Sequence, residues 1–134
     1  MSIQWTESLA VGIPLVDEQH KELFNRVNML LDASSKGKGK EEITGLVEFL
    51  GAYVVTHFRS EEGQMAQAGY PSLTAHKQLH SDFINDFEGL RVAFKANGAT
   101  TVLVLQLQHK VVEWLLQHIG KEDKAFGAFL RARA

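Results

Sequence analysis

Histidine is the residue type in this chain with the clearest potential for metal chemistry. The sequence contains six histidines and no cysteine, so a metal ion would be held through nitrogen and oxygen atoms. His57 with Glu61, and His76 with His80, have the four-residue spacing that places two side chains on one face of a helix. Each pair could therefore chelate one ion. Helical histidines are more often surface or core groups, so neither pair alone establishes a site.

The composition excludes several other classes of protein. Without cysteine there are no disulfides, thiolate zinc sites, iron–sulfur clusters, covalent c-type haem or cysteine nucleophiles. The length of 134 residues suits one domain over residues 1–134, and a net charge of -2 argues against a nucleic-acid partner. The N-terminus lacks a basic start, and the apolar run Val102 to Leu105 is too short to span a membrane. We expect no integral membrane segment and a cytoplasmic location.

The elements that must position the histidines are predicted to be helices. The chain contains only two prolines, Pro14 and Pro71. Long segments without proline are separated by turns that contain glycine. Short connections favour antiparallel neighbours. We predict an all-α fold, an up-down-up-down antiparallel four-helix bundle over residues 17–120, with an irregular arm over 1–16 and a short helical tail over 121–134. The helices are expected at Asp17–Ser35, Glu41–Ala68, Ser72–Lys95 and Thr100–Ile119, and the tail helix at Lys121–Leu130.

Each predicted helix carries at least one histidine on its inward stripe, the row of apolar residues spaced by three and four. In the third helix this stripe is Leu73, His76, His80, Phe83, Phe87, Leu90 and Phe94. The same rule selects His20 in the first helix, His57 and Glu61 in the second, and His118 in the fourth. A polar ring without a partner is costly in a core. The antiparallel arrangement places all of these residues toward one end of the bundle.

Five imidazoles with one or two carboxylates exceed the needs of a single four-coordinate zinc ion. Two metal ions bridged by carboxylates would use the whole set. Imidazole with carboxylate suits iron, although ligand type also permits manganese, zinc or copper. The second carboxylate is expected near His118, where simple four-residue spacing selects Glu122 and a distorted turn near Gly120 would select Asp123. Spacing leaves both open.

Four segments, GIPLVDEQH, HFRSEE, HKQLH and WLLQHIGKEDK, occur in this order. Together they resemble the hemerythrin family in its single-domain bacterial form, from about Ile13 to Lys124. The resemblance implies two iron ions (Fe2+/Fe3+) with an oxo or hydroxo bridge. It assigns one iron to His76, His80 and His118, the other to His20 and His57, and both bridging positions to Glu61 and Asp123. The resemblance therefore selects Asp123 over Glu122.

The resemblance also implies a function, which is reversible O2 binding at a non-haem di-iron centre. The protein would be an oxygen carrier, store or donor to O2-consuming enzymes, and not itself an enzyme. O2 would bind at a vacant position on the two-histidine iron, in a pocket walled by Leu23, Phe58, Trp114, Leu115 and Ile119. Leu23 and Ile119 are equally well explained as bundle core.

Other functions use the same ligands. The alternatives are an O2 or redox sensor that acts through a separate partner, a di-iron enzyme that handles peroxide or nitric oxide, and a zinc ion that only joins the helices. A protein that receives O2 is compatible with the leading function, and the sequence does not identify one.

Five residues near these motifs are given simpler roles. We expect His109 to be exposed, Glu62 to face away from Glu61 into solvent, and Asp17 to cap the first helix, with a contact to a ligand ring as its alternative. Trp5 is expected to anchor the arm and Tyr70 the turn that follows the second helix.

Overall fold

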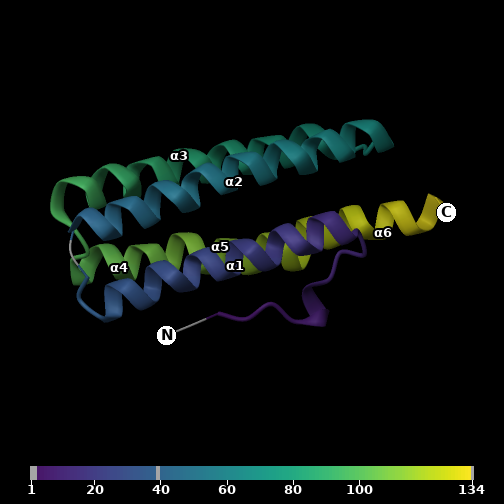
Figure 1. Ribbon diagram of the computed structural model, residues 1–134. Coiled ribbons are helices and arrows are strands. Elements are labelled where there is room, and N and C mark those ends of the chain that lie inside the picture. Colours follow the sequence, from purple (N-terminus) through teal and green to yellow (C-terminus); the bar gives the residue numbers. More distant parts are fainter. Residues whose placement is uncertain (1–2, 39, 134) are drawn as a thin grey trace.

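Four long helical rods run antiparallel and enclose the core, which confirms the predicted four-helix bundle (Figure 1). A computed structural model describes residues 3–38 and 40–133. The first three rods are single helices, α1 (Pro14–Ser35), α2 (Lys40–Ala68) and α3 (Leu73–Asn97). The fourth contains α4 (Thr101–Leu107), α5 (Glu113–Gln117) and α6 (Lys124–Arg133).

The first helix begins earlier than predicted, at Pro14, with Ile13 at the N-cap position. Proline suits this place because the first turn of a helix needs no backbone N–H donor. The predicted capping role of Asp17 is therefore wrong, since Asp17 lies inside the first turn. Its carboxylate accepts hydrogen bonds from the backbone N–H groups of Val11 (2.8 Å) and Gly12 (3.3 Å) and so ties the preceding arm to α1.

The arm, residues 3–13, is irregular apart from a short 3-10 helix at Glu7–Leu9, and it runs beside α1 (Figure 1). Asn28 exchanges two hydrogen bonds of 2.8 Å with the backbone of Ile3. The predicted anchor Trp5 packs against the core, with the Lys21 ammonium 4.6 Å from the centre of its ring. The arm is thus fixed to the bundle along its length.

The arm also contacts the end of the fourth rod. Lys124 Nζ donates to the carbonyl of Ser8 (2.8 Å), and Arg131 Nη1 donates to the carbonyl of Val11 (3.0 Å). The Tyr70 ring packs on the Phe126 ring, and the two ring centres are 5.0 Å apart. The last helix therefore contacts both the arm and the α2–α3 turn. Tyr70 anchors this turn, as predicted.

The fourth rod differs most from the prediction. Instead of a helix ending at Ile119 and a separate tail, it is one unbroken rod from Thr101 to Arg133. Two π-helical segments interrupt its α-helical geometry, at Gln108–Val112 and His118–Asp123. A π-turn accommodates one more residue than an α-turn, so it absorbs the distortion near Gly120 without breaking the rod. The tail is helical as predicted, and it continues the fourth helix.

The predicted inward stripes form the core. The same spacing gives stripes in the other rods, and the residues of the first two are all buried: His20, Leu23, Val27 and Leu30 in α1, and Ile43, Val47, Leu50, Val54, His57 and Glu61 in α2. In α3 only Leu73, at the start of the stripe, is partly exposed. In the fourth rod the stripe is Val104, Leu107, Val111, Leu115 and His118, of which only Val104 is partly exposed, while the neighbouring Leu103 is buried. Periodicity therefore located the buried faces, with errors confined to helix ends.

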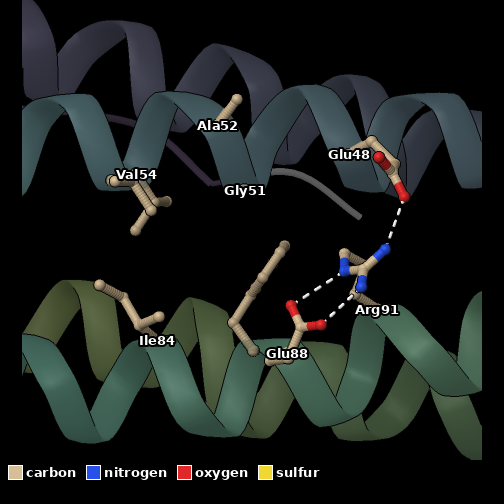
Figure 2. Close-up of a pocket in the computed structure, with 9 residues that line it drawn as sticks. Glu48, Gly51, Ala52, Val54, Ile84, Glu88 and Arg91 are labelled. Carbon is tan, nitrogen blue, oxygen red and sulfur yellow. Dashed lines mark hydrogen bonds and ion pairs between the residues drawn. The ribbon is translucent and has the colours of Figure 1, made fainter.

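A close approach between α2 and α3 occurs at Gly51, where a Cβ atom would come within 2.8 Å of the Phe87 ring. Arg91 of α3 joins the same two helices through an ion pair to Glu48 of α2, and it also pairs with Glu88 on its own helix (Figure 2). These residues line a surface cavity of about 280 Å³. Because Gly51 has no side chain, the Phe87 ring fills the space between the two helices.

A substitution in α6 tests the contact with the arm. A Cβ atom at Gly127 would overlap the backbone carbonyl of Val11, and it would lie 2.9 Å from Val11 Cγ1. We expect Gly127→Ala to lower the free energy of unfolding by about 1–3 kcal/mol, because neither backbone can move without breaking hydrogen bonds. Urea denaturation measures the change.

Gly89→Ala is the matched control, since nothing lies within 4 Å of a Cβ atom there. This variant should keep or raise stability, by up to about 1 kcal/mol, because alanine favours helix. A Gly127→Ala protein as stable as the wild type would contradict the packing of the arm on α6.

Candidate metal centre

Seven ionisable side chains are buried together inside the bundle, and none is more than 5% exposed. They come from all four rods. The group consists of His20 from α1, His57 and Glu61 from α2, His76 and His80 from α3, and His118 and Asp123 from the fourth rod. The structure thus brings together every residue that the sequence analysis expected at a metal centre. Their role as ligands stays a prediction.

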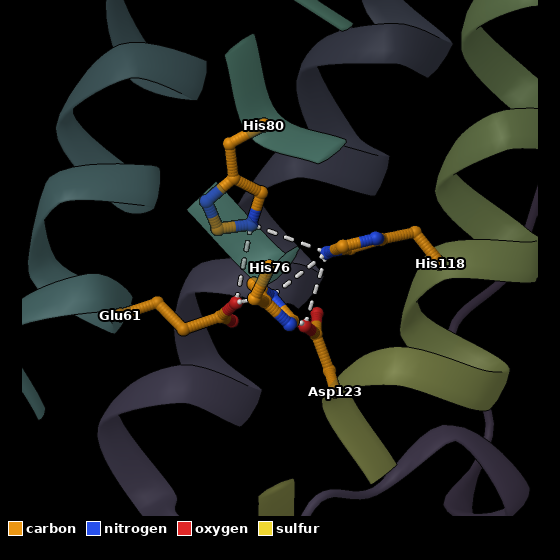
Figure 3. Close-up of side chains that lie close together, drawn as sticks. All are labelled: Glu61, His76, His80, His118 and Asp123. Carbon is orange, nitrogen blue, oxygen red and sulfur yellow. Dashed lines mark hydrogen bonds and ion pairs between the residues drawn. The ribbon is translucent and has the colours of Figure 1, made fainter. Parts of the chain in front are cut away.

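The seven residues form two overlapping groups, in each of which one potential ligand atom per residue lies within 4.8 Å of the others. The three-histidine group contains Glu61, His76, His80, His118 and Asp123 (Figure 3). The two-histidine group contains His20, His57, Glu61 and Asp123. Both carboxylates belong to both groups, which is the arrangement that two bridged metal ions require.

Glu61 divides its two oxygens between the groups. Its Oε1 atom faces the three-histidine group, 2.7 Å from His76 Nε2 and 3.4 Å from His80 Nε2. Its Oε2 atom faces the two-histidine group, 3.6 Å from His20 Nε2 and 3.5 Å from His57 Nε2. A single carboxylate can therefore reach both positions.

Asp123 is divided in the same way. Its Oδ1 atom lies 3.1 Å from His76 Nε2 and 3.2 Å from His118 Nε2, and its Oδ2 atom lies 3.0 Å from His20 Nε2. Both carboxylates therefore turn one oxygen toward each histidine group, as bridging ligands do. This shared geometry is the most specific feature of the site.

Two histidines have their ring orientation fixed from outside the cluster. His57 Nδ1 lies 2.7 Å from the amide oxygen of Gln19, and His80 Nδ1 lies 2.7 Å from Oε2 of Glu62. Both oxygens can only accept, so each Nδ1 donates its hydrogen, and the Nε2 lone pairs point into the cluster. This is the protonation pattern that a metal-binding imidazole needs.

The sequence analysis missed both of these outer partners. Glu62 was expected to be solvated, and this expectation is wrong, because its side chain is only 22% exposed and bonded to His80. Gln19 was assigned no role. The only sequence signal for Glu62 is its place beside Glu61 in the segment HFRSEE, and helical spacing within α2 does not show that a side chain from α3 meets it.

The donor set fits cations. Within residues 3–38 and 40–133, Glu61 Oε2 and both carboxylate oxygens of Asp123 are buried and lack a hydrogen-bond partner. Both nitrogens of His20 are in the same condition, since the 3.0 Å contact with Asp123 does not have hydrogen-bond geometry. Buried polar atoms in this state are costly unless a cation compensates them.

The pKa shifts lead to the same requirement. Burial and the nearby Asp123 charge would raise the pKa of Glu61, but the surrounding imidazoles outweigh them and lower it to about 2. Burial lowers the pKa of His20 and of His76, yet the two carboxylates raise each to about 9. The pKa of His57 shifts in the opposite direction, because burial lowers it to about 4. The carboxylates thus stay ionised in a dry site and demand positive charge beside them.

The π-helical segment decides between the two carboxylates that spacing left open. A π-turn brings residues five apart to the same side of the helix, so Asp123 faces the cluster together with His118. Asp123 is 1% exposed. Glu122 instead lines a small surface cavity of about 190 Å³, beside Lys121 and Trp114. The distorted turn near Gly120 is therefore present, and the buried carboxylate is Asp123.

The residues predicted to wall an O2 pocket lie in the core around the cluster. Leu23, Leu115, Ile119 and Phe58 are buried, and Trp114 is partly exposed. The Phe58 ring stacks on His80 with ring centres 3.8 Å apart, and Trp114 stacks on His118 at 4.3 Å. These two aromatic rings thus support the three-histidine group. A pocket beside the two-histidine group stays a prediction.

His109, the sixth histidine, is exposed, as expected.

A comparison with protein families matches residues 11–130 to the hemerythrin HHE cation binding domain. The chain belongs to the hemerythrin family. It is 35% identical to a bacteriohemerythrin of Methylococcus capsulatus over 129 residues, which is 96% of each chain. It is 34% identical to a bacteriohemerythrin of Pseudomonas paraeruginosa, covering 91% of this chain and 77% of that protein.

Other hemerythrins agree in sequence and in structure. A myohemerythrin of Theromyzon tessulatum is 29% identical over 120 residues, 90% of this chain and 87% of that protein. The fold matches the crystal structure of a wild-type hemerythrin with a TM-score of 0.83 and 34% identity, covering 94% of this chain and 95% of the other. Membership of this family supports O2 binding at a non-haem di-iron site. The names of these relatives point to O2-binding proteins rather than to enzymes.

No helix within the described ranges has both the length and the apolar character to cross a membrane.

The assignment of Asp123 is tested by replacing the two neighbouring carboxylates one at a time. We expect Asp123→Asn to bind fewer than two metal ions per chain, or to bind them more than about tenfold more weakly, because the bridging charge is lost. Elemental analysis and competition with a chelator measure both. Glu122→Gln, which changes the adjacent side chain outside the cluster, should bind two ions with unchanged affinity. The reverse result would assign the ligand to Glu122.

Proposed function

We propose that this hemerythrin binds O2 reversibly at a non-haem di-iron centre, as an oxygen carrier, store or donor to O2-consuming enzymes. Two iron ions (Fe2+/Fe3+) with an oxo or hydroxo bridge would be held by the two groups of side chains. The observation that supports this most directly is that Glu61 and Asp123 each turn one oxygen toward each group. The cytoplasmic location and the protein that receives O2 stay predictions.

The two groups offer unequal numbers of ligands. The three-histidine group provides three nitrogens and two carboxylate oxygens, whereas the two-histidine group provides two nitrogens and two oxygens. An iron in the two-histidine group is therefore one protein ligand short of its neighbour. A small molecule such as O2 would find its binding position there.

The charge of the ligand set favours binding over oxidation. Di-iron proteins of the ferritin-like class use four carboxylates and two histidines. This site has two carboxylates and five imidazoles, so less negative charge is available to stabilise iron above the ferric state. When bound, the iron pair supplies the two electrons that O2 takes up and returns.

The chain's apolar side chains would keep the bound gas from water. Leu23, Leu115 and Ile119 are each at most 1% exposed and belong to the same buried cluster as Phe58. Excluding water and anions from the site slows irreversible oxidation of the metal. The three aliphatic residues would thus hold O2 in a dry environment without donating a hydrogen bond to it.

Anaerobic loading with ferrous iron tests the function. We expect two irons per chain, and absorption bands in the visible region that appear on adding O2 and disappear on removing it over repeated cycles. Zinc is colourless, so zinc-loaded protein is the blank. Irreversible oxidation with release of a product would support the enzyme alternative, and a protein that binds only zinc would support a structural metal.

The charge argument predicts the effect of one substitution in the two-histidine group. His57→Glu adds a third carboxylate to the cluster, so the variant should oxidise irreversibly at least about tenfold faster in air. The decay of the O2-dependent absorption measures this rate. His109→Glu makes the same change at an exposed position and should behave as wild type. Equally stable O2 binding in His57→Glu would contradict the charge argument.

A further inference from the structure

The two hydrogen bonds that hold His57 and His80 from outside the cluster are alike in length but differ in charge. Each Nδ1 atom donates across 2.7 Å. The acceptor for His57 is the neutral amide of Gln19, which in turn donates to Ser60 Oγ at 3.4 Å. The acceptor for His80 is the carboxylate of Glu62. The two metal positions are therefore supported unequally.

A carboxylate behind an imidazole increases the electron density on the ring. The Nδ1 hydrogen is drawn toward the negative oxygen, and the opposite nitrogen, Nε2, becomes a stronger donor to whatever it binds. An amide oxygen gives the same orientation with a much smaller effect. His80 is thus the stronger donor of the two, and it belongs to the three-histidine group.

The surroundings of His80 preserve this effect. The Phe58 ring lies parallel to the imidazole, with an angle of 1° between the planes, and so covers one face of it. The His80 side chain is 1% exposed, and that of Glu62 is 22% exposed. Water has little access to the ring, so the charge of Glu62 acts on it through a poorly screened hydrogen bond.

We propose that Glu62 is a positioning residue that directs the higher oxidation state to the three-histidine position, by making His80 a stronger donor than Gln19 makes His57. This inference rests on the proposed di-iron function. After loss of one electron, the three-histidine position would hold the ferric ion and the two-histidine position the ferrous ion. Both ions would have to be ferrous before the pair could supply two electrons to O2.

A purely structural role for Glu62 is the competing explanation. In that case Glu62 only fixes the ring of His80, which an amide oxygen does equally well for His57. The variant Glu62→Gln separates the two roles, because it keeps an acceptor for the Nδ1 hydrogen and removes the charge. The variant Gln19→Glu makes the opposite change beside His57.

The experiment uses the full-length protein loaded with iron and oxidised by one electron without O2. Mössbauer spectra then report which position is ferric, since the positions differ in ligand number. In the wild type we expect most ferric ions in the three-histidine position. In Glu62→Gln the ratio of the two populations should move at least about tenfold toward the two-histidine position, and the reduction potential of the centre should rise.

Two further variants complete the test. The double variant Gln19→Glu/Glu62→Gln keeps the net charge and should invert the ratio seen in the wild type. Glu41→Gln removes a charge from the exposed start of α2, far from the cluster, and should leave the ratio unchanged. An unchanged ratio in Gln19→Glu would overturn the proposal, and this variant keeps Glu62, so the result stands even if Glu62→Gln fails to hold iron. Where the double variant holds iron, an unchanged ratio there would overturn the proposal as well.

Failure of this inference differs visibly from failure of the function on which it rests. If the wild type does not take up two irons or does not release O2, the proposed function is wrong. If the wild type takes up two irons and cycles O2, but the charge of Glu62 does not affect the ferric population, only the role of Glu62 is wrong.

Discussion

The fold of this chain depends on compensating two carboxylates that are buried at its centre. Glu61 and Asp123 are almost completely removed from water and remain ionised, so positive charge must lie on both sides of each. All four rods contribute a histidine that faces these carboxylates, and His20 and His76 have their pKa raised to about 9 beside them. The requirement fixes the rotation of every helix about its own axis, because an error in any one of them would turn an imidazole into the apolar core or leave a carboxylate oxygen facing hydrocarbon.

The same requirement explains the unusual geometry of the fourth rod. A regular α-helix would bring Glu122 rather than Asp123 onto the face of His118, and the π-helical segment at His118–Asp123 corrects this by one residue. Such a segment is less favourable than α-helix, and it is held by neighbours. Directly after it, Lys124 is bonded to the arm through Ser8. The irregular N-terminal segment thus supports a distortion at the opposite end of the chain.

Much of the architecture could be predicted because it follows from periodicity. The spacing of His76 and His80 on an apolar stripe located both the buried face of α3 and two residues of the buried cluster. The roles of Gln19 and Glu62 could not be predicted, since each bonds to a different helix, and sequence spacing describes only positions on the same one. The start of α1 at Pro14 was missed because the acidic Asp17 gave a stronger capping signal than the proline.

The bond between Ser8 and Lys124 joins positions 116 residues apart in the chain, and the cluster likewise spans about a hundred positions from His20 to Asp123. Contacts of this kind form late in folding, because the entropy of closing a long loop must be overcome first. His20, His57 and His76 therefore meet both shared carboxylates only after the segment that carries Asp123 has packed against the first three rods. A metal ion that required both carboxylates would be captured by the folded bundle and not by a fragment of it.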